Sequence, residues 1–226
     1  MVDQTSDLNK IYCFGDNPKL LTFNIGQMLW QAQTFDNNSS YDGSLKYMAC
    51  CCTPFSDSQA YQRRIYLSGG VFNNNSFPSS TFFELQPKSL TKPIKRKNMQ
   101  IKRFGHSMVY LNGVVYSLGG FGHKDLPNEV PVTLSSCERY TAHDNNWQFA
   151  GTMNEARAFM ACVVLDNQYI YAMGGMHDFN IIQTIEKYDC LSDSWLSVYF
   201  KLPLPLAKHG AVVVDNKSIL ICGGMS

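Results

Sequence analysis

The sequence carries almost no excess of charge of either sign. Its 19 Lys and Arg and 18 Asp and Glu leave a net charge of +1 over 226 residues, so no strong field selects nucleic acid or a membrane surface. It also lacks an apolar leader, because Met1 to Lys10 is polar, and it lacks an apolar run near the ~20 residues of a membrane span. We therefore expect a cytoplasmic or nuclear protein with reduced thiols, and neither nucleic acid nor a membrane as partner.

Short motifs for catalysis or metal binding are scarce as well. The sequence contains no His-x-x-x-His, Gly-x-Ser-x-Gly or Cys-x-x-Cys pattern. Cys50, Cys51 and Cys52 are adjacent in an expected strand, where neighbouring side chains point to opposite faces, so all three cannot share one metal cluster. Core packing is the simpler role for them. We expect no cofactor and no metal site.

A short segment that recurs along the chain is the main positive signal. Asn112 to Gly120 reads as a tight Asn-Gly turn, an apolar strand and a closing glycine pair. Similar segments return about every fifty residues, which is typical of repeat architectures. The glycine pairs are Gly69-Gly70, Gly119-Gly120, Gly174-Gly175 and Gly223-Gly224, and a degenerate copy ends at Gly15.

Two further columns accompany the glycine pairs in a fixed order. After the pairs come a Glu-x-Tyr motif and a Trp, and the Trp follows the aromatic residue by seven positions. These residues are Glu138, Tyr140 and Trp147 in one copy and Glu186, Tyr188 and Trp195 in the next. Phe23 and Trp30 repeat the spacing near the start. Before the pairs lies a basic residue that opens an apolar run, namely Lys46, Arg103, Arg157 or Lys208.

In this combination of motifs the chain resembles the kelch repeat, over nearly its whole length. The resemblance implies an all-β fold, a β-propeller of four-stranded antiparallel blades around a central channel. We expect one partial kelch propeller over residues 1–226. Its repeats would span 1–45 with strands two to four only, then 46–102, 103–156 and 157–207, and 208–226 with strands one and two only. In the family, the buried Glu positions help tie blades together, and we expect Trp147 and Trp195 to pack between blades.

The two ends of this array do not complement each other. Counted this way, the chain holds about four and a quarter blades, and the last repeat adds a second strand that competes with the first strand of the chain. We therefore expect an incomplete ring, either a fragment or a chain lacking a segment after Ser226.

One face of the expected propeller is better suited to binding than the other. Because strands alternate in direction, the basic column shares a face with the loops that follow the glycine pairs, Val71–Ser80, Phe121–Ser135 and Met176–Gln183. Long loops on a rigid scaffold commonly carry binding sites. The opposite face has tight turns at Asn112-Gly113, Asp166-Asn167 and Asp215-Asn216.

The basic column admits two roles. In kelch adaptors the arginines of this column recognise acidic peptides, and the resemblance makes Arg103 and Arg157 candidates because a guanidinium takes a carboxylate with two parallel bonds. Lys46 and Lys208 would act as point charges. Alternatively, each basic residue ties its blade to the next through a carboxylate or a carbonyl. His123 and His177 fall on the same loop face and complete the candidate partner-binding set.

A cluster of seven basic residues between Lys88 and Arg103 replaces the Trp in the second repeat. Lysines on an outer strand protect its edge from unwanted strand pairing. A patch for an acidic partner, or an import-like address at Lys95-Arg96-Lys97, is the alternative.

Together these patterns favour a protein-interaction module rather than an enzyme. It would bind a protein or an acidic peptide on the loop face, as a substrate adaptor or a cytoskeletal scaffold. The alternative is a kelch-like propeller enzyme with a metal or small-molecule site at the channel mouth, where His123 and His177 would be the available imidazoles.

Overall fold

Every regular element in the described part of the chain is a β-strand. The computed structural model describes residues 10–14, 19–24, 27–34, 45–53, 63–72, 77–86, 92–123 and 130–226. Over these ranges no helix is long and apolar enough to cross a membrane. The strands form five antiparallel sheets, which we number in chain order, and three short ribbons.

Three of the sheets have four strands each, as the expected blades do. The second sheet orders β5 (Ala49–Cys52), β6 (Ile65–Ser68), β8 (Phe82–Leu85) and β9 (Ile94–Lys95). The third orders β10 (Ser107–Leu111), β11 (Val114–Leu118), β14 (Cys137–Thr141) and β15 (Asn146–Ala150). The fourth orders β16 (Ala161–Leu165), β17 (Tyr169–Met173), β20 (Ile185–Asp189) and β21 (Ser194–Ser197).

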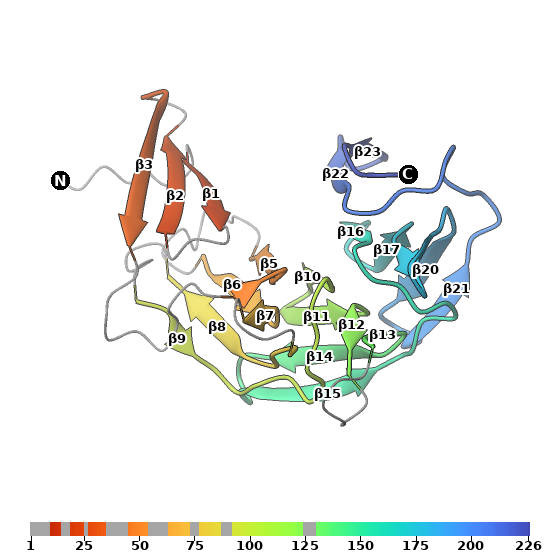
Figure 1. Cartoon of the computed structure of the whole chain (residues 1–226), viewed down its shortest axis with the longest axis horizontal. Coiled ribbons are helices and arrows are strands. Elements are labelled where there is room, and N and C mark those ends of the chain that lie inside the picture. The colour runs from red at the N-terminus through yellow and green to blue at the C-terminus, as the bar shows by residue number, and fades with distance from the viewer. Residues whose placement is uncertain are drawn as a thin grey trace.

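The sheets at the two ends are smaller. The first sheet contains β1 (Lys10–Phe14), β2 (Lys19–Asn24) and β3 (Leu29–Thr34), and the fifth contains β22 (Gly210–Val214) and β23 (Ser218–Cys222). Figure 1 shows the sheets following one another along an arc, with the first and fifth at its two ends. Among the described strands, none of the first sheet pairs with β22 or β23.

The three ribbons follow the glycine pairs. They join β4 (Leu45–Lys46) to β7 (Val71–Phe72), β12 (Phe121–Gly122) to β13 (Val132–Thr133), and β18 (Met176–His177) to β19 (Asn180–Ile181). The first strands of successive sheets contact one another in the order β5, β10, β16 and β22. They therefore form the inner wall of the arc.

Local turn chemistry explains the hairpins at the opposite end of the strands. Both central residues of each tight turn, Asn112-Gly113, Asp166-Asn167 and Asp215-Asn216, have positive φ. Two successive positive φ angles match the strand twist of a hairpin, and Asn, Asp and Gly adopt them most readily. Asn112-Gly113 forms a two-residue loop, whereas the other two loops contain one more residue, Gln168 or Lys217. We call this side of the arc the turn face and the side with the ribbons the loop face.

The seven-residue step from aromatic residue to Trp is a hairpin register. Tyr140 pairs directly with Trp147, Tyr188 with Trp195 and Phe23 with Trp30. In the third and fourth sheets the Tyr hydroxyl also donates to the turn, to Asn145 at 2.9 Å and to Asp193 at 2.6 Å. In these two sheets the hairpin therefore places two large rings on the same face.

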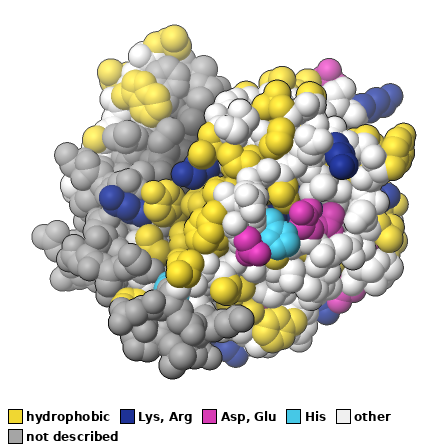
Figure 2. Space-filling view, turned by 45° about the vertical axis from the view of Figure 1, so that its right-hand side comes forward, with side chains coloured by type: hydrophobic (Ala, Val, Ile, Leu, Met, Phe, Trp, Pro, Cys, Tyr) yellow, Lys and Arg dark blue, Asp and Glu magenta, His cyan; other side chains and the backbone are white. Residues whose placement is uncertain are grey.

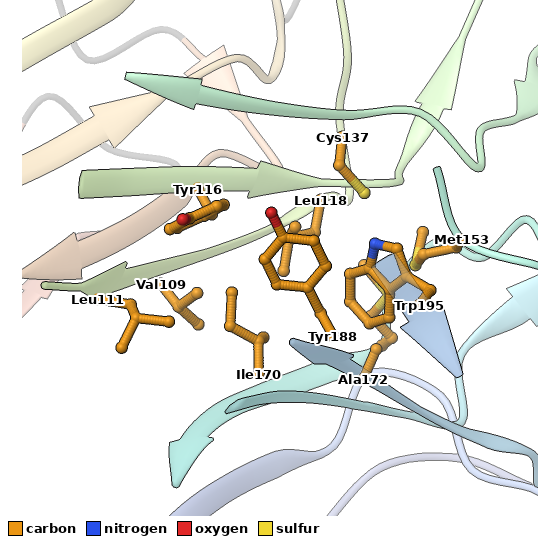
Figure 3. Close-up of a cluster of buried hydrophobic side chains, with 11 residues drawn as sticks. Val109, Leu111, Tyr116, Leu118, Cys137, Met153, Ile170, Ala172, Tyr188 and Trp195 are labelled. Carbon is orange, nitrogen blue, oxygen red and sulfur yellow. The ribbon is translucent and has the colours of Figure 1, made fainter. Parts of the chain in front are cut away.

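Those rings form the core between neighbouring sheets. Trp195 and Tyr188 of the fourth sheet face Leu118 and Cys137 of the third (Figure 3). The Trp195 indole donates to the carbonyl of Gly151, 2.8 Å away in the linker between these sheets, and Trp147 does the same to Lys97 at 2.9 Å. Each Trp thus supplies apolar area and satisfies a linker carbonyl.

A buried histidine lies at the next interface toward the N-terminus. His106 shares a 2.7 Å hydrogen bond with the Ser68 hydroxyl. Burial, and secondarily the positive charge of Arg103, hold the pKa of His106 well below its usual value. The equivalent positions in the second and fourth sheets are Met48 and Met160, so the fold accommodates an uncharged side chain there.

We expect His106 to make stability depend on pH. Its folded-state pKa lies below the unfolded value near 6.5, so the unfolded chain binds more protons and stability falls as the pH drops below about 6.5. Urea unfolding at pH 7.5 and 5.5 should show His106→Met losing less stability than wild type, with a slope reduced by up to about 1.4 kcal/mol per pH unit. Equal slopes for the two proteins would contradict this assignment.

Candidate functional site

The two arginines of the expected basic column are buried structural residues. Arg103 has 0% exposure and pairs with Glu138, which also has 0% exposure, at 2.8 Å between Nη2 and Oε1. Its Nη1 donates to the carbonyls of Gly119 at 2.7 Å and Ser136 at 2.9 Å. Arg157 repeats the pattern with Glu186 at 2.8 Å and with the carbonyls of Gly174 and Thr184, both at 3.0 Å.

The carboxylates in these pairs reach across to the preceding linker. Glu138 accepts hydrogen bonds from the backbone N–H groups of Gln100 at 2.7 Å and Ile101 at 3.1 Å. Glu186 accepts from Asn154 at 2.8 Å and Glu155 at 3.0 Å. The geometry thus favours the second role expected from the sequence, in which the charge ties one blade to the next, and it leaves the guanidinium groups no face for a partner.

The expectation of a single column of four basic residues is wrong, because their registers differ. The second glycine of each of the first three pairs donates its N–H to a carbonyl in the next linker. Gly70 donates to Arg103 and Gly120 to Arg157, both at 2.9 Å, whereas Gly175 donates to Leu206 at 2.7 Å. Lys208 therefore lies two positions after the arginine position. Lys46 lies one position after it, because Lys46 pairs with Val71 as Phe104 does with Phe121.

Lys208 belongs instead to a backbone ladder that crosses all four linkers. Gly105 N–H donates to the Tyr47 carbonyl at 3.0 Å, Phe159 N–H to Gly105 at 2.6 Å and Lys208 N–H to Phe159 at 2.8 Å. All four residues are left-handed, with φ between 52° and 59°. The ladder links equivalent positions of successive sheets on the loop face.

Aromatic side chains gather where this ladder meets the ribbons. The Phe159 ring contacts Tyr47 at 5.6 Å and Phe121 at 5.8 Å between centroids, and Phe121 stacks on Phe179 at 5.4 Å. Lys208 Nζ lies 5.0 Å from the Phe159 centroid. Tyr47 is 51% and Phe179 57% exposed, so the cluster reaches the surface.

The two candidate histidines have different surroundings. His177, at the end of β18, lies between two carboxylates, with Nδ1 3.6 Å from Glu155 and Nε2 3.5 Å from Asp178. Figure 2 shows hydrophobic side chains beside a histidine with acidic groups on both sides. His123 follows β12, and its ring lies 5.9 Å from Phe77. The two imidazoles thus have different neighbours, carboxylates for His177 and an aromatic ring for His123.

Glu155 connects the loop face to the buried ion pairs. It contacts Arg157 at 3.2 Å and accepts a hydrogen bond from Thr184, so Arg157 has two carboxylates where Arg103 has one. The equivalent residue in the previous linker is Ile101. The fourth sheet thus presents additional negative charge toward the ribbon β18–β19.

The basic cluster between Lys88 and Arg103 is partly used inside the fold. Arg96 pairs with the fully buried Glu84 at 2.9 Å, and Lys97 Nζ donates to Asn146 at 2.6 Å. Lys95 lies in the outer strand β9 and is exposed. This arrangement fits an outer-strand segment better than an extended import-like address at Lys95-Arg96-Lys97.

Within the described ranges no three His, Cys, Asp or Glu side chains converge as metal ligands would. Aligning the repeats on their basic residues does not reveal the aromatic cluster. Counting instead from the start of the apolar strand aligns Phe159 with Gly105 and Tyr47. Phe179, which occupies a turn position that usually holds Gly or Asn, was a second available signal.

Four-stranded antiparallel sheets with this glycine, Trp and Arg–Glu architecture define kelch-type propeller blades. The chain belongs to the kelch-repeat family, because the family model for the KLHDC2/KLHL20/DRC7 Kelch-repeats domain matches residues 5–224.

Curated relatives agree with this assignment at lower identity. The chain is 28% identical to alpha-scruin of Limulus polyphemus over 176 residues, which cover 73% of this chain and 18% of the relative. It is 26% identical to Kelch-like protein 15 of Danio rerio over 140 residues, 55% of this chain and 23% of the relative. The chain thus spans roughly a fifth of the length of these relatives.

Proposed function

We propose that this kelch domain is a non-catalytic protein-interaction module that binds a protein or peptide on its loop face. The aromatic cluster of exposed Tyr47 and Phe179 and half-buried Phe159, beside Lys208, carries the proposal. Exposed rings with a neighbouring charge are typical of the energetic centre of an interface. In the third, fourth and fifth sheets the turn face instead carries short polar turns between the first two strands.

Its homology to kelch-like proteins and scruins supports this role, since such domains typically bind proteins. An acidic segment is the favoured partner, with Lys208 as the accessible cation of the cluster in place of the buried arginines. Substrate adaptor and cytoskeletal scaffold are both compatible uses. Cys51, Cys137, Cys162 and Cys190 are reduced thiols outside any disulfide, which fits action in the cytoplasm or nucleus.

The proposal predicts that one face controls partner binding. Phe179→Asp places a charge on the loop face at a turn position that Asp tolerates, and Lys217→Glu changes charge on the turn face. Quantitative affinity purification from the source cells should show partners whose recovery falls about fivefold or more with Phe179→Asp and stays unchanged with Lys217→Glu. Identical recovery with both variants would refute loop-face binding.

A further inference from the structure

Three of the four ladder residues hold their side chains in a strained backbone conformation. Tyr47, Phe159 and Lys208 have φ of 55°, 52° and 56°, a region that bulky L-residues rarely adopt. The fourth ladder residue is Gly105, so the ladder itself requires no side chain. Side chains kept at such positions despite the strain indicate a function beyond folding.

A fourth strained residue joins them from the ribbon β18–β19. Phe179 has φ of 66° in a two-residue turn, where glycine or asparagine would fit better, and its ring stacks on Phe121 at an interplanar angle of 20°. We call Tyr47, Phe159, Phe179 and Lys208 the platform. Its rings are linked through Phe121, and rigid rings of this kind offer large contact area at little cost in side-chain entropy.

Charge is distributed unevenly around the platform. Lys208 places an exposed ammonium group over the Phe159 ring. Beside Phe179, in contrast, Asp178 and Glu155 flank His177. An anionic group on a ligand is therefore attracted at the Lys208 end and repelled at the Asp178 end, so the platform orients what it binds.

We infer that the platform binds a peptide segment in which an aromatic or aliphatic side chain lies next to a carboxylate. The apolar side chain packs on the Tyr47 and Phe159 rings, and the carboxylate lies at Lys208. This inference rests on the proposed function and specifies the ligand chemistry. It assigns recognition of the acid to a lysine outside the buried Arg–Glu pairs.

A library of random 12-residue peptides displayed on phage and selected against the full chain provides the probe. Enriched peptides should combine an aromatic or aliphatic residue with a nearby Asp or Glu. Phe159→Gly, which copies Gly105 and keeps the ladder, should weaken their affinity by at least about tenfold in fluorescence polarisation. Tyr47→Gly is the second variant if Phe159→Gly fails to fold. The control Tyr199→Ser, at a residue 94% exposed and outside the platform, should leave affinity unchanged.

The acid contact is tested by a double-mutant cycle. Lys208→Gln should weaken binding of the parent peptide and have no further effect on a peptide whose Asp or Glu is changed to Asn or Gln, because the two changes remove the same interaction. Independent effects would overturn the carboxylate assignment.

The remaining outcomes separate this inference from the proposed function. Peptides whose affinity is unaffected by Phe159→Gly and Tyr47→Gly but lost with Phe179→Asp would sink the platform and leave loop-face binding intact. Peptides whose affinity is lost only with Tyr199→Ser or Lys217→Glu would overturn both the platform and loop-face binding. Failure to enrich any peptide, or enrichment of peptides without a carboxylate, would overturn the stated ligand chemistry.

Discussion

Replacing Glu138 with alanine is expected to destabilise the fold by about 3–5 kcal/mol, because it leaves the buried guanidinium of Arg103 without a carboxylate. The backbone N–H groups of Gln100 and Ile101 also lose their acceptor, which adds an unsatisfied-donor cost. The free energy of unfolding in urea at pH 7 measures this loss directly.

Arg139 provides a matched control on the adjacent residue. It pairs with Asp193 at 3.6 Å, and both side chains are more than a third exposed. Such exposed pairs contribute only about 0–1 kcal/mol, so Arg139→Ala should change stability little. Similar losses for the two variants would show that the buried pair has no special role.

Apolar residue types at the equivalent positions of β4 and β8 suggest a compensating replacement. By register, Leu45 stands at the position of Arg103 and Phe83 at that of Glu138. The double variant Arg103→Leu with Glu138→Phe should therefore be about 1–4 kcal/mol more stable than the sum of the single losses predicts, since neither buried charge remains unpaired. Strict additivity would contradict this coupling.

Gly119→Ala is expected to destabilise the fold by about 3–5 kcal/mol. A Cβ at Gly119 would lie 2.3 Å from the backbone oxygen of Arg157, which accepts a 2.9 Å hydrogen bond from Gly120. The cost combines left-handed strain, about 1–2 kcal/mol, with a clash that no flexible side chain can relieve.

Gly113→Ala separates these two contributions. Gly113 also has positive φ, but a Cβ there would meet nothing within 4 Å. It should therefore cost only the strain, about 1 kcal/mol. Thermal unfolding gives the shift in Tm for Gly119→Ala and for Gly113→Ala. Equal shifts would mean that the close contact between the linker and the glycine pair adds nothing to the cost of the Gly119 substitution.

The sequence predicts the blades well because their signals are local. An Asn-Gly or Asp-Asn pair specifies its own turn, and a Tyr and a Trp seven residues apart meet across one hairpin. These relations hold within about ten residues, so neither the rest of the chain nor the number of blades affects them.

The candidate site was harder to predict because its registers depend on linkers of different length. Arg103 precedes its strand by four residues and Lys208 precedes its strand by two. An alignment of the repeats on the basic residue therefore equates positions that have different environments. Nothing local in Arg103 shows that its carboxylate partner is 35 residues away. Burial of the arginine follows from that distant pairing.

The backbone ladder has an electrostatic consequence for the loop face. Its hydrogen bonds run from one sheet to the next, so the peptide dipoles point around the arc rather than along its axis. A helix end aims its N–H groups at an anion and thereby selects for negative charge. The ladder dipoles therefore favour neither sign of charge on the loop face, and the positive charge of the platform comes from the Lys208 side chain.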